Sequence, residues 1–324
     1  FKDNAFSYWS ATSDGAVVTQ GGAASKLPDP ATRRVFTDVA GGTLTAAGNA
    51  FTATNTAITT TMLGIDSRPE LSRDDVINYG RGMDVMDQNG DGTTTDARLR
   101  LGDPLHAKPA IMIYGGTPAN PDLGDAVVYF SDNEGYLHAV DPDTGVALWS
   151  YLPTETMGNL ADFMVNGETG NKIYGLDGNI RPVRIDMNDN GIIEPAGGDR
   201  VILYFGMRRG GETVFAVDVT RKDSPRLLWK ADSATLPGIG QTWSTPVPAR
   251  VDIGGTKRAV LLIGGGYDTS QDTTLYSRDT VGRAIYMVDA ETGARLWWAG
   301  GLGSGADLED ANMDNSIPGD IRVL

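Results

Sequence analysis

The stretch Gly135-Tyr-Leu-His-Ala-Val-Asp141, followed by Thr144-Gly-Val-Ala-Leu-Trp149, decides the fold class, because variants of it occur three times in the chain. The second copy is Thr213-Val-Phe-Ala-Val-Asp218 with Arg226-Leu-Leu-Trp229, and the third is Ala284-Ile-Tyr-Met-Val-Asp289 with Thr292-Gly-Ala-Arg-Leu-Trp297. The closing Asp residues are 77 and 71 positions apart. A repeat of this length is typical of arrays of small β-units.

Each repeat contains two further apolar runs upstream of this phrase. The outer runs are 109–114, 180–185 and 246–251, and the inner runs begin at Val127, Val201 and Ala259. Four short strands make one propeller blade, so we predict an all-β fold, a modified β-propeller of four-stranded blades. The Trp of each fourth strand is expected to pack on a neighbouring blade. A β-sandwich with chance similarity between strands is the alternative.

The repeats divide the chain. We expect blades over residues 108–153, 172–232 and 243–300, and the first strand of a further blade over 314–324. Residues 1–107 are expected to form an irregular β region within the propeller domain, with a short helix that begins after Ser72. A propeller needs about four to eight blades, so this one is expected to be incomplete in the chain. Either residues 1–107 supply further strands or the natural protein continues beyond Leu324.

Composition excludes several classes of function. The chain of 324 residues has a net charge of −15, which disfavours nucleic acid as a partner. It contains no Cys, so disulfides and thiol chemistry are excluded. No apolar run is long enough to span a membrane. The chain opens on Phe1 rather than Met, from which we expect a processed product or a fragment.

The stretch Asp186-Met-Asn-Asp-Asn-Gly-Ile-Ile-Glu194 predicts a calcium site. Oxygen side chains alternate around a Gly at the sixth position, as a hard cation requires. The twelfth position is Gly197 instead of Glu, and Pro195 disfavours an exiting helix, so we expect a modest affinity. An Asn- and Gly-rich turn that bonds to its own backbone is the alternative. The expected ligands are Asp186, Asn188, Asn190, Glu194 and the carbonyl group of Ile192.

A second acidic loop, Asp87-Gln-Asn-Gly-Asp-Gly-Thr93, has the first half of the same pattern. Its second half is weak, because Thr95 and Arg98 stand at the ninth and twelfth positions. The candidate ligands of a second calcium ion are Asp87, Asn89, Asp91 and Thr93. A flexible acidic loop is the alternative.

No catalytic constellation is visible, and we predict a protein that is not an enzyme. The two histidines, His106 and His138, lie in strand-like contexts typical of structural residues. The sequence contains no Gly-x-Ser-x-Gly elbow, His-Glu-x-x-His motif or P-loop. A polar segment, residues 267–282, interrupts the third repeat, and such a segment can carry partner binding.

Several phrases resemble the C-terminal domain of the PilY1/PilC family, tip-located type IV pilus biogenesis factors and adhesins of Gram-negative bacteria. The resemblance covers nearly the whole chain. Its most specific phrases are Leu-Gly-Asp-x-x-His-x-x-Pro and Asn-Ser-Ile-Pro. The matching stretches are Gly21-Gly-Ala-Ala, Arg33-Arg-Val-Phe-Thr37, Leu101-Gly-Asp-Pro-Leu-His106 with Pro109, the blade phrase from Phe130 to Trp149, and Asn315-Ser-Ile-Pro318 with Arg322-Val-Leu324.

The resemblance implies a modified propeller whose EF-hand-like calcium loop, at the positions given above, controls pilus extension and retraction. It implies calcium as cofactor, and a role in pilus biogenesis, twitching motility and adhesion. The implied partners are minor pilins or other pilus machinery and a host or surface receptor. The implied location, after export through the periplasm, is the pilus tip, cell surface or outer membrane of a Gram-negative bacterium. A quinoprotein-like dehydrogenase and a carbohydrate-binding propeller are the alternative functions.

Overall fold

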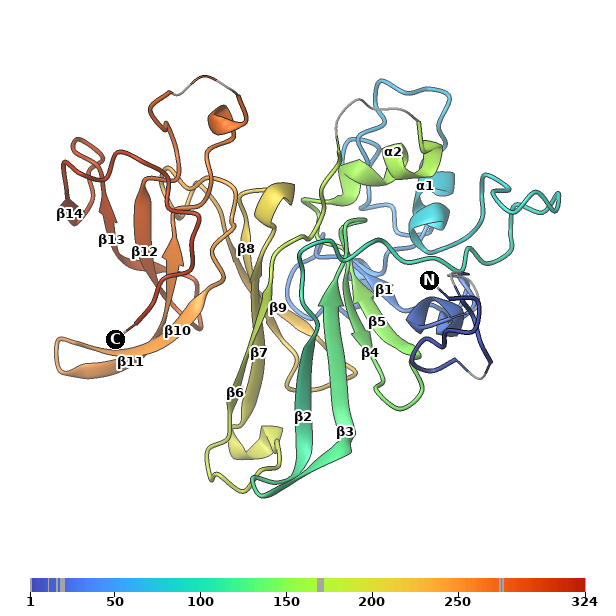
Figure 1. Cartoon of the computed structure of the whole chain (residues 1–324), viewed down its shortest axis with the longest axis horizontal. Helices are drawn as coiled ribbons and strands as arrows, with labels where there is room; N and C mark the ends of the chain where they lie inside the picture. Colours follow the sequence, from blue (N-terminus) through green and yellow to red (C-terminus); the bar gives the residue numbers. More distant parts are fainter. Residues whose placement is uncertain are drawn as a thin grey trace.

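The structure is a computed structural model that describes residues 2–10, 12–15, 17, 21–167, 172–273, 275 and 277–323. In this part of the chain three β-sheets follow one another along the sequence and lie side by side (Figure 1). The first holds β1 (Val35–Phe36), β2 (Ala110–Thr117), β3 (Asn120–Ser131), β4 (Leu137–Val140) and β5 (Ala147–Tyr151). The second holds β6 (Ile180–Ile185), β7 (Arg200–Gly206), β8 (Val214–Asp218) and β9 (Arg226–Ala231). The third holds β10 (Val247–Ile253), β11 (Thr256–Gly264), β12 (Ala284–Asp289), β13 (Arg295–Gly300) and β14 (Leu308–Glu309).

Every sheet is built on four consecutive antiparallel strands, which confirms the predicted four-strand repeat. In each sheet the register shifts between the third and fourth strands, after Ala139, Ala216 and Met287. Two sheets gain an extra short strand by parallel pairing at the outer edge, β1 on β5 and β14 on β13. The chain is therefore mostly β with three sheets.

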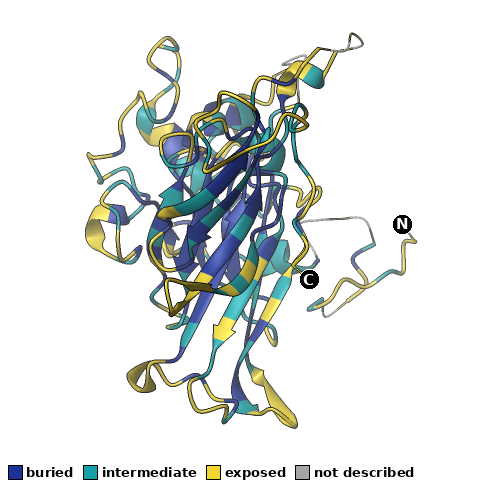
Figure 2. Ribbon diagram, turned by 90° about the vertical axis from the view of Figure 1, so that its left-hand side faces the viewer, coloured by how far each residue is buried: buried dark blue, intermediate teal, exposed yellow. Residues whose placement is uncertain are grey.

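The sheets pack face to face, and side-chain alternation along β7 explains how. Val201, Leu203 and Phe205 join a core shared with the first sheet, whereas Ile202 and Tyr204 join a core shared with the third. Successive residues of a strand point to opposite faces, so a strand buried on both faces must be apolar throughout. The buried residues run through the centre of the strands in Figure 2.

The predicted packing of Trp on a neighbouring repeat is confirmed for the first two repeats, whereas in the third Trp297 is partly exposed and the adjacent Trp298 is buried. The indole Nε1 of Trp149 in the first sheet donates to the carbonyl oxygen of Lys222 in the second, at 2.7 Å. Trp229 in the second sheet donates likewise to Ala290 in the third, at 3.1 Å. Near the N-terminus, Trp9 makes the same type of bond to Pro142, at 2.6 Å. Each indole bond joins an outer strand or terminal segment to the turn of the following sheet.

Residues 21–107 add the predicted short helix and a third core. Helix α1 (Arg73–Gly80) begins after Ser72, whose hydroxyl group accepts the backbone N–H of Asp75. It packs with α2 (Leu160–Val165) over the end of the first sheet. The shorter 3-10 helices are η1 (Ala23–Lys26), η2 (Ala47–Asn49), η3 (Met157–Asn159), η4 (Pro195–Gly197), η5 (Arg208–Gly210) and η6 (Thr269–Gln271).

Residues 314–323 contain no strand. Ile317 makes an isolated bridge to Gly266, while Leu324 lies outside the described residues. The expected first strand of a further blade therefore stays a prediction. Among the described residues no helix is long and apolar enough to cross a bilayer.

Candidate metal centre

The loop 186–199 joins β6 to β7, which places the predicted calcium residues in the first hairpin of the second sheet, as expected. Ile185 and Arg200 are the last paired residues before the loop. Pro195 starts the three-residue helix η4, so the loop does not continue into an α-helix. The loop resembles an EF-hand only in its first nine positions.

Asp186 is the most buried of the candidate ligands, with a side chain 11% exposed. Its Oδ2 atom accepts the backbone N–H of Gly191 at 2.8 Å and lies 3.3 Å from Nη2 of Arg184. Its Oδ1 atom is buried and has no hydrogen-bond partner among the described residues. A buried carboxylate oxygen without a donor is costly, which favours an added cation at this atom.

The side chains of Asn188 and Asn190 both contact Glu194. The Oδ1 atoms of the two Asn side chains accept backbone N–H groups two residues ahead, at 3.0 Å and 2.7 Å. Their amide nitrogens both donate to Oε2 of Glu194, at 3.2 Å and 2.9 Å. A carboxamide oxygen has two lone pairs, so each Oδ1 can hold its turn and still coordinate a cation.

Gly191 is required by both conformation and space. Its φ angle is +91°, and a Cβ atom there would lie 2.7 Å from the Cα atom of Thr117 and from the Cδ atom of Pro118. These two residues lie at the β2–β3 turn, so the loop packs on the first sheet. Ile193 attaches it further, because its N–H donates to the carbonyl oxygen of Tyr114 at 2.7 Å.

Asp199, the last residue of the loop, hydrogen-bonds to the backbone of the loop. Its carboxylate accepts the N–H groups of Met187 and Glu194, both at 2.8 Å, and these bonds lower the pKa of Asp199. The loop therefore has a preformed shape.

The donor set fits a hard divalent cation such as calcium, which takes about six to eight oxygen ligands. Two carboxylates, two carboxamides and the Ile192 carbonyl group are within one loop. The described part of the chain contains no cluster of three or more His, Cys, Asp or Glu side chains that could hold a metal. The expected site at 186–194 is not such a cluster, because only two of its ligands, Asp186 and Glu194, are acidic.

The second loop is only partly brought together. Asn89 donates to Oδ2 of Asp91 at 3.2 Å and to Oδ2 of Asp96 at 3.0 Å. Asp87 accepts the N–H of Gly92, and Asp91 accepts the backbone N–H of Thr93, whereas the side chain of Thr93 makes no hydrogen bond within the described residues. The predicted Thr93 is therefore the least supported member of this set.

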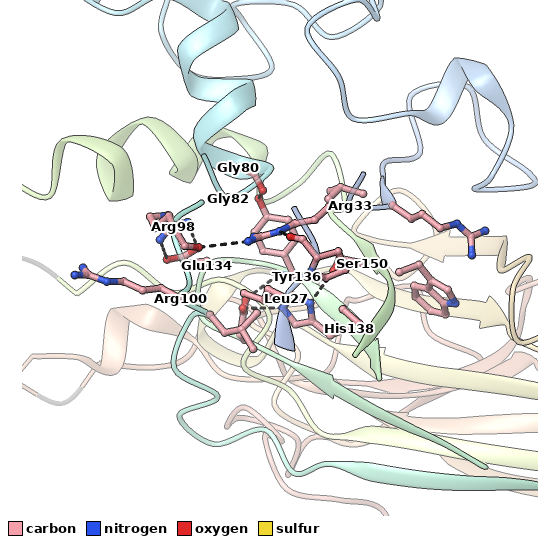
Figure 3. Close-up of a pocket in the computed structure, with 17 residues that line it drawn as sticks. Leu27, Arg33, Gly80, Gly82, Arg98, Arg100, Glu134, Tyr136, His138 and Ser150 are labelled. Atoms are coloured by element: carbon pink, nitrogen blue, oxygen red, sulfur yellow. Dashed lines mark hydrogen bonds and ion pairs between the residues drawn. The ribbon is translucent and has the colours of Figure 1, made fainter. Parts of the chain in front are cut away.

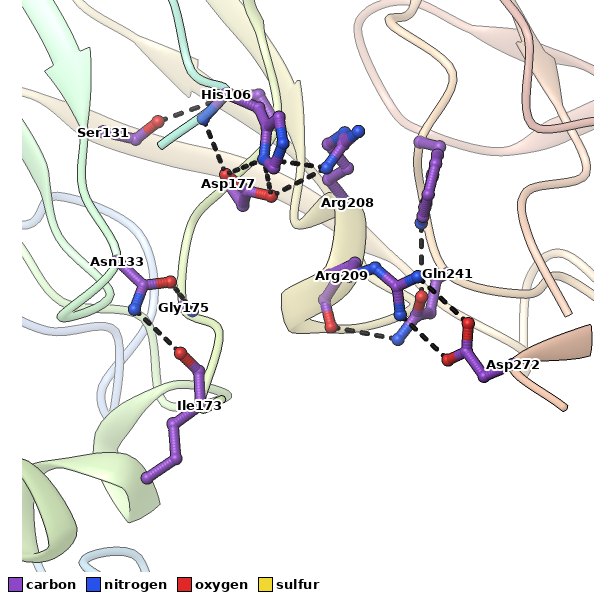
Figure 4. Close-up of polar contacts among 12 residues, drawn as sticks. His106, Ser131, Asn133, Ile173, Gly175, Asp177, Arg208, Arg209, Gln241 and Asp272 are labelled. Atoms are coloured by element: carbon purple, nitrogen blue, oxygen red, sulfur yellow. Dashed lines mark hydrogen bonds and ion pairs between the residues drawn. The ribbon is translucent and has the colours of Figure 1, made fainter. Parts of the chain in front are cut away.

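The two histidines are held by hydrogen bonds. His138 is buried, and its ring nitrogens contact Ser150 Oγ at 2.8 Å and Asp132 Oδ2 at 2.9 Å (Figure 3). His106 is half exposed and contacts the buried carboxylate of Asp177, which also pairs with Arg208 at 3.1 Å (Figure 4). The contacts of His138 lie within the first sheet, whereas those of His106 join the segment before β2 to the second sheet. Both agree with the predicted structural role.

Arg209 makes the corresponding connection from the second sheet to the segment inserted in the third. Its guanidinium group pairs with both carboxylate oxygens of Asp272, at 2.9 Å and 3.0 Å (Figure 4). The predicted polar segment 267–282 is thus attached to the neighbouring sheet. Residues 274 and 276 of this segment lie outside the described residues.

Sequence comparison relates this chain to pilus proteins. It is 26% identical over 312 residues, 88% of the chain, to the type IV pilus biogenesis factor PilY1 of Pseudomonas aeruginosa strain UCBPP-PA14. It is 33% identical over 216 residues, 60% of the chain, to a PilY1 homologue of Xylella fastidiosa. No protein-family model matches the chain. The chain is a homologue of PilY1.

This PilY1 homologue spans 25% of the length of the Pseudomonas relative and 16% of the Xylella relative. Its structure aligns with the crystal structure of the P. aeruginosa PilY1 C-terminal domain over 59% of this chain and 35% of that one, with 23% identity and a TM-score of 0.38. The relation to PilY1 rests on the sequence similarity along the chain.

Two carboxylates of the PilY1 homologue belong to these loops but do not follow the calcium pattern. Asp199 stands at the fourteenth position of the first loop, directly before β7. Asp96 stands at the tenth position of the second, and its Oδ1 atom is buried without a partner among the described residues. In both loops the sequence signal for this carboxylate was an acidic residue a few positions after the calcium pattern.

Proposed function

We propose that this PilY1 homologue is a calcium-binding, non-enzymatic part of a type IV pilus biogenesis factor. It is exported and acts at the pilus tip or cell surface of a Gram-negative bacterium. There it supports pilus extension and retraction and adhesion, through contacts with minor pilins or other pilus machinery and with a surface receptor. The three sheets are blades of a modified propeller to which further blades belong.

The observation that carries the proposal is the buried Oδ1 atom of Asp186, which has no hydrogen-bond partner among the described residues. The other oxygen side chains of the loop contact one another at Glu194. Calcium would replace the amide–carboxylate contacts of Glu194 with direct coordination. The cost of gathering the oxygens is small, because Gly191 and Asp199 already hold the backbone in its turn.

A bound cation would stabilise more than its own loop. Gly191 packs on Thr117 and Pro118, and Ile193 bonds to Tyr114 in β2. Calcium would thus fix the surface formed by the loop and the β2–β3 turn together. A pilus partner that recognises this surface would bind the calcium-loaded protein in preference, by linkage.

Thermal unfolding with calcium and with chelator tests the binding step. Calcium at about 100 times its Kd stabilises the folded state by about 2.7 kcal/mol, which raises the melting temperature of the wild type. Asp186→Asn keeps the shape of the side chain but removes its charge, and the calcium shift should disappear. Asp189→Asn is the matched control, because Asp189 is exposed in the same loop and outside the ligand set.

A wild-type melting temperature that is the same in calcium and in chelator would rule out the calcium proposal. A calcium shift retained in Asp186→Asn would place the ion elsewhere. The pilus role is tested separately, by twitching motility of a strain that carries Asp186→Asn in the full-length protein.

We also propose a weaker second cation site at Asp87, Asn89, Asp91 and Thr93, the residues of the sequence pattern. The contact between Asn89 and Asp91 supports this set. Its test is the stoichiometry of binding, described below.

A further inference from the structure

Three of the phrases that resemble the family are not used by the calcium loop, and they meet at one pocket (Figure 3). The pocket is narrow, with a cavity volume of about 40 Å³. Arg33 lines it from the phrase at 33–37, Leu101 from the phrase at 101–106, and Asp132 and Glu134 from the blade phrase. Ser150 closes it from β5.

The charge of this pocket is opposite to that of the molecule. Four Arg and two acidic residues line it, in a chain of net charge −15. The Arg residues are Arg33, Arg34, Arg98 and Arg100. A local excess of positive charge on an acidic protein favours anions at that place.

Both acidic residues of the lining are already neutralised. Glu134 pairs with Arg98 through two bonds of 3.1 Å. Asp132 accepts backbone N–H groups of Gly102, Gly135 and Tyr136 at 3.0–3.1 Å, together with the contact from His138. Neither carboxylate is left to pair with Arg33.

Arg33 is bonded only to backbone carbonyl groups. Its Nε atom donates to Pro28 at 2.6 Å, and Nη2 lies 3.5 Å from the carbonyl oxygen of Arg98. Within the described residues no carboxylate lies at ion-pair distance from it. The nearby carboxylate of Asp29 accepts the N–H of Ala31. Burial and the neighbouring Arg98 lower the pKa of Arg33 to about 10, so its charge is incompletely compensated.

A hydroxyl group lies in the same lining. The Oγ atom of Ser150 is 2.8 Å from Nδ1 of His138. Since Nε2 of His138 faces the carboxylate of Asp132, that nitrogen carries the proton and Nδ1 accepts from Ser150. Ser150 donates to His138, and His138 donates to Asp132. The guanidinium group of Arg33 is therefore the strong donor available to a ligand.

We propose that this pocket binds a carboxylate group, held by the guanidinium group of Arg33. The fork of guanidinium donors binds a carboxylate or a phosphate group through two bonds, and the narrow pocket favours the smaller carboxylate group. The carboxylate comes either from a free organic acid or from a protein, as an acidic side chain or a chain terminus. The site is separate from the calcium loop and does not depend on it.

Titration of the wild-type chain with acetate, acetamide and phosphate tests the ligand chemistry. Backbone amide resonances of the pocket residues report binding by NMR. Acetate should shift them, whereas acetamide, of the same shape but uncharged, should not. Equal effects of acetate and acetamide, tighter binding of phosphate than of acetate, or no shift with acetate would each overturn the proposal.

Two dipeptides distinguish the sources of the carboxylate. The first dipeptide ends in a free carboxylate, and the second, its control, ends in an amide. N-acetylaspartate amide represents an acidic side chain. If the free dipeptide or N-acetylaspartate amide binds more tightly than acetate, the ligand is a protein, and the tighter probe shows whether a chain terminus or an acidic side chain is bound. Equal binding of acetate and both carboxylate probes identifies a free organic acid.

Arg33→Met keeps most of the aliphatic stem and removes the charge. It should weaken acetate binding about tenfold or more, the scale of a hydrogen bond to a charged group. Arg258→Met, an exposed position in β11, is the matched control and should bind acetate as the wild type does. Unchanged acetate binding in folded Arg33→Met would overturn the role of Arg33. The acetate–acetamide comparison decides the proposal if Arg33→Met fails to fold.

Discussion

The backbone N–H of Ile193 donates a 2.7 Å hydrogen bond to the carbonyl oxygen of Tyr114. Ile193 belongs to the loop between β6 and β7, whereas Tyr114 lies in β2 of the first sheet. Tyr114 is itself fixed, because its buried hydroxyl group bonds to Tyr129 and to the carbonyl oxygen of Val219. The candidate calcium loop is therefore a contact between two sheets as well as a turn within one.

Gly191→Ala should weaken this contact. The new Cβ atom would lie 2.7 Å from the backbone of Thr117, and the φ angle of +91° is unfavourable for Ala. We expect a loss of about 2–4 kcal/mol in the free energy of unfolding, measured with urea, and weaker calcium binding. Gly254→Ala is the control, because Gly254 has a φ of +61° with open space around it. Equal losses in both variants would show that contact with Thr117 is unimportant.

Asp91→Asn tests the second cation site. If both loops bind calcium, calorimetric titration of the wild type should give two ions per chain, and Asp91→Asn should give one. Asp103→Asn, at an exposed carboxylate outside both loops, should leave the count at two. A wild-type count of one that disappears in Asp186→Asn would mean that the loop at 87–96 is only an acidic turn.

Trp149→Phe should destabilise the contact between the first and second sheets. Trp149 is 1% exposed, and its removal leaves a cavity and an unpaired carbonyl group at Lys222. We expect the free energy of unfolding to fall by about 2–3 kcal/mol. Trp243→Phe should cost less than about 1 kcal/mol, because that indole is partly exposed and bonds to the side chain of Gln241. A smaller loss for Trp149→Phe would contradict the proposed importance of the indole bond.

The carboxylate of Asp268 should make the stability of the folded protein depend on pH. Although burial favours its neutral form, hydrogen bonds from Thr280, Ser270 and Val281 hold the pKa of Asp268 well below its usual range. Its charge therefore stabilises the folded state above the unfolded pKa of about 3.9, and that stabilisation is lost as the pH falls through the folded pKa.

Asp268→Asn should cost about 2 kcal/mol at pH 7, and the difference from the wild type should shrink as the pH is lowered below about 4. Urea unfolding of both proteins at pH 7, 4 and 3 measures this difference. Asp252→Asn, in an exposed turn, serves as the control for a general loss of negative charge. A difference that stays constant with pH would exclude the charge of Asp268 as its cause.

The local elements could be predicted because their causes lie within a few residues of sequence. Alternating apolar residues predict β6 at 180–185, and the hydroxyl group of Ser72 together with acidic residues in the first turn predicts α1. The oxygen pattern from Asp186 to Glu194 likewise depends on spacing along one loop. The repeat of the Trp phrase indicated that the sheets would contact one another.

Contacts between distant segments were not predictable in this way. β1 pairs with β5 although Val35 and Ser150 are 115 positions apart, and two residues make too short a run to identify their partner. Asp199 acts on the loop because the hairpin returns it beside Met187. Asn89 likewise contacts Asp96, a residue that the spacing of the calcium pattern does not include.

The sequence by itself determined the repeating four-strand units, the turns that end them and the residue types of the calcium loop, because these follow from local periodicity, conformational preference and spacing. Only the tertiary structure decided that this loop packs on β2, that one oxygen of Asp186 is buried with no partner among the described residues, and that Arg33 lies in a pocket where no described carboxylate is at ion-pair distance from it. Burial and charge compensation depend on which distant segments meet, and that is set by the packing of the sheets as a whole.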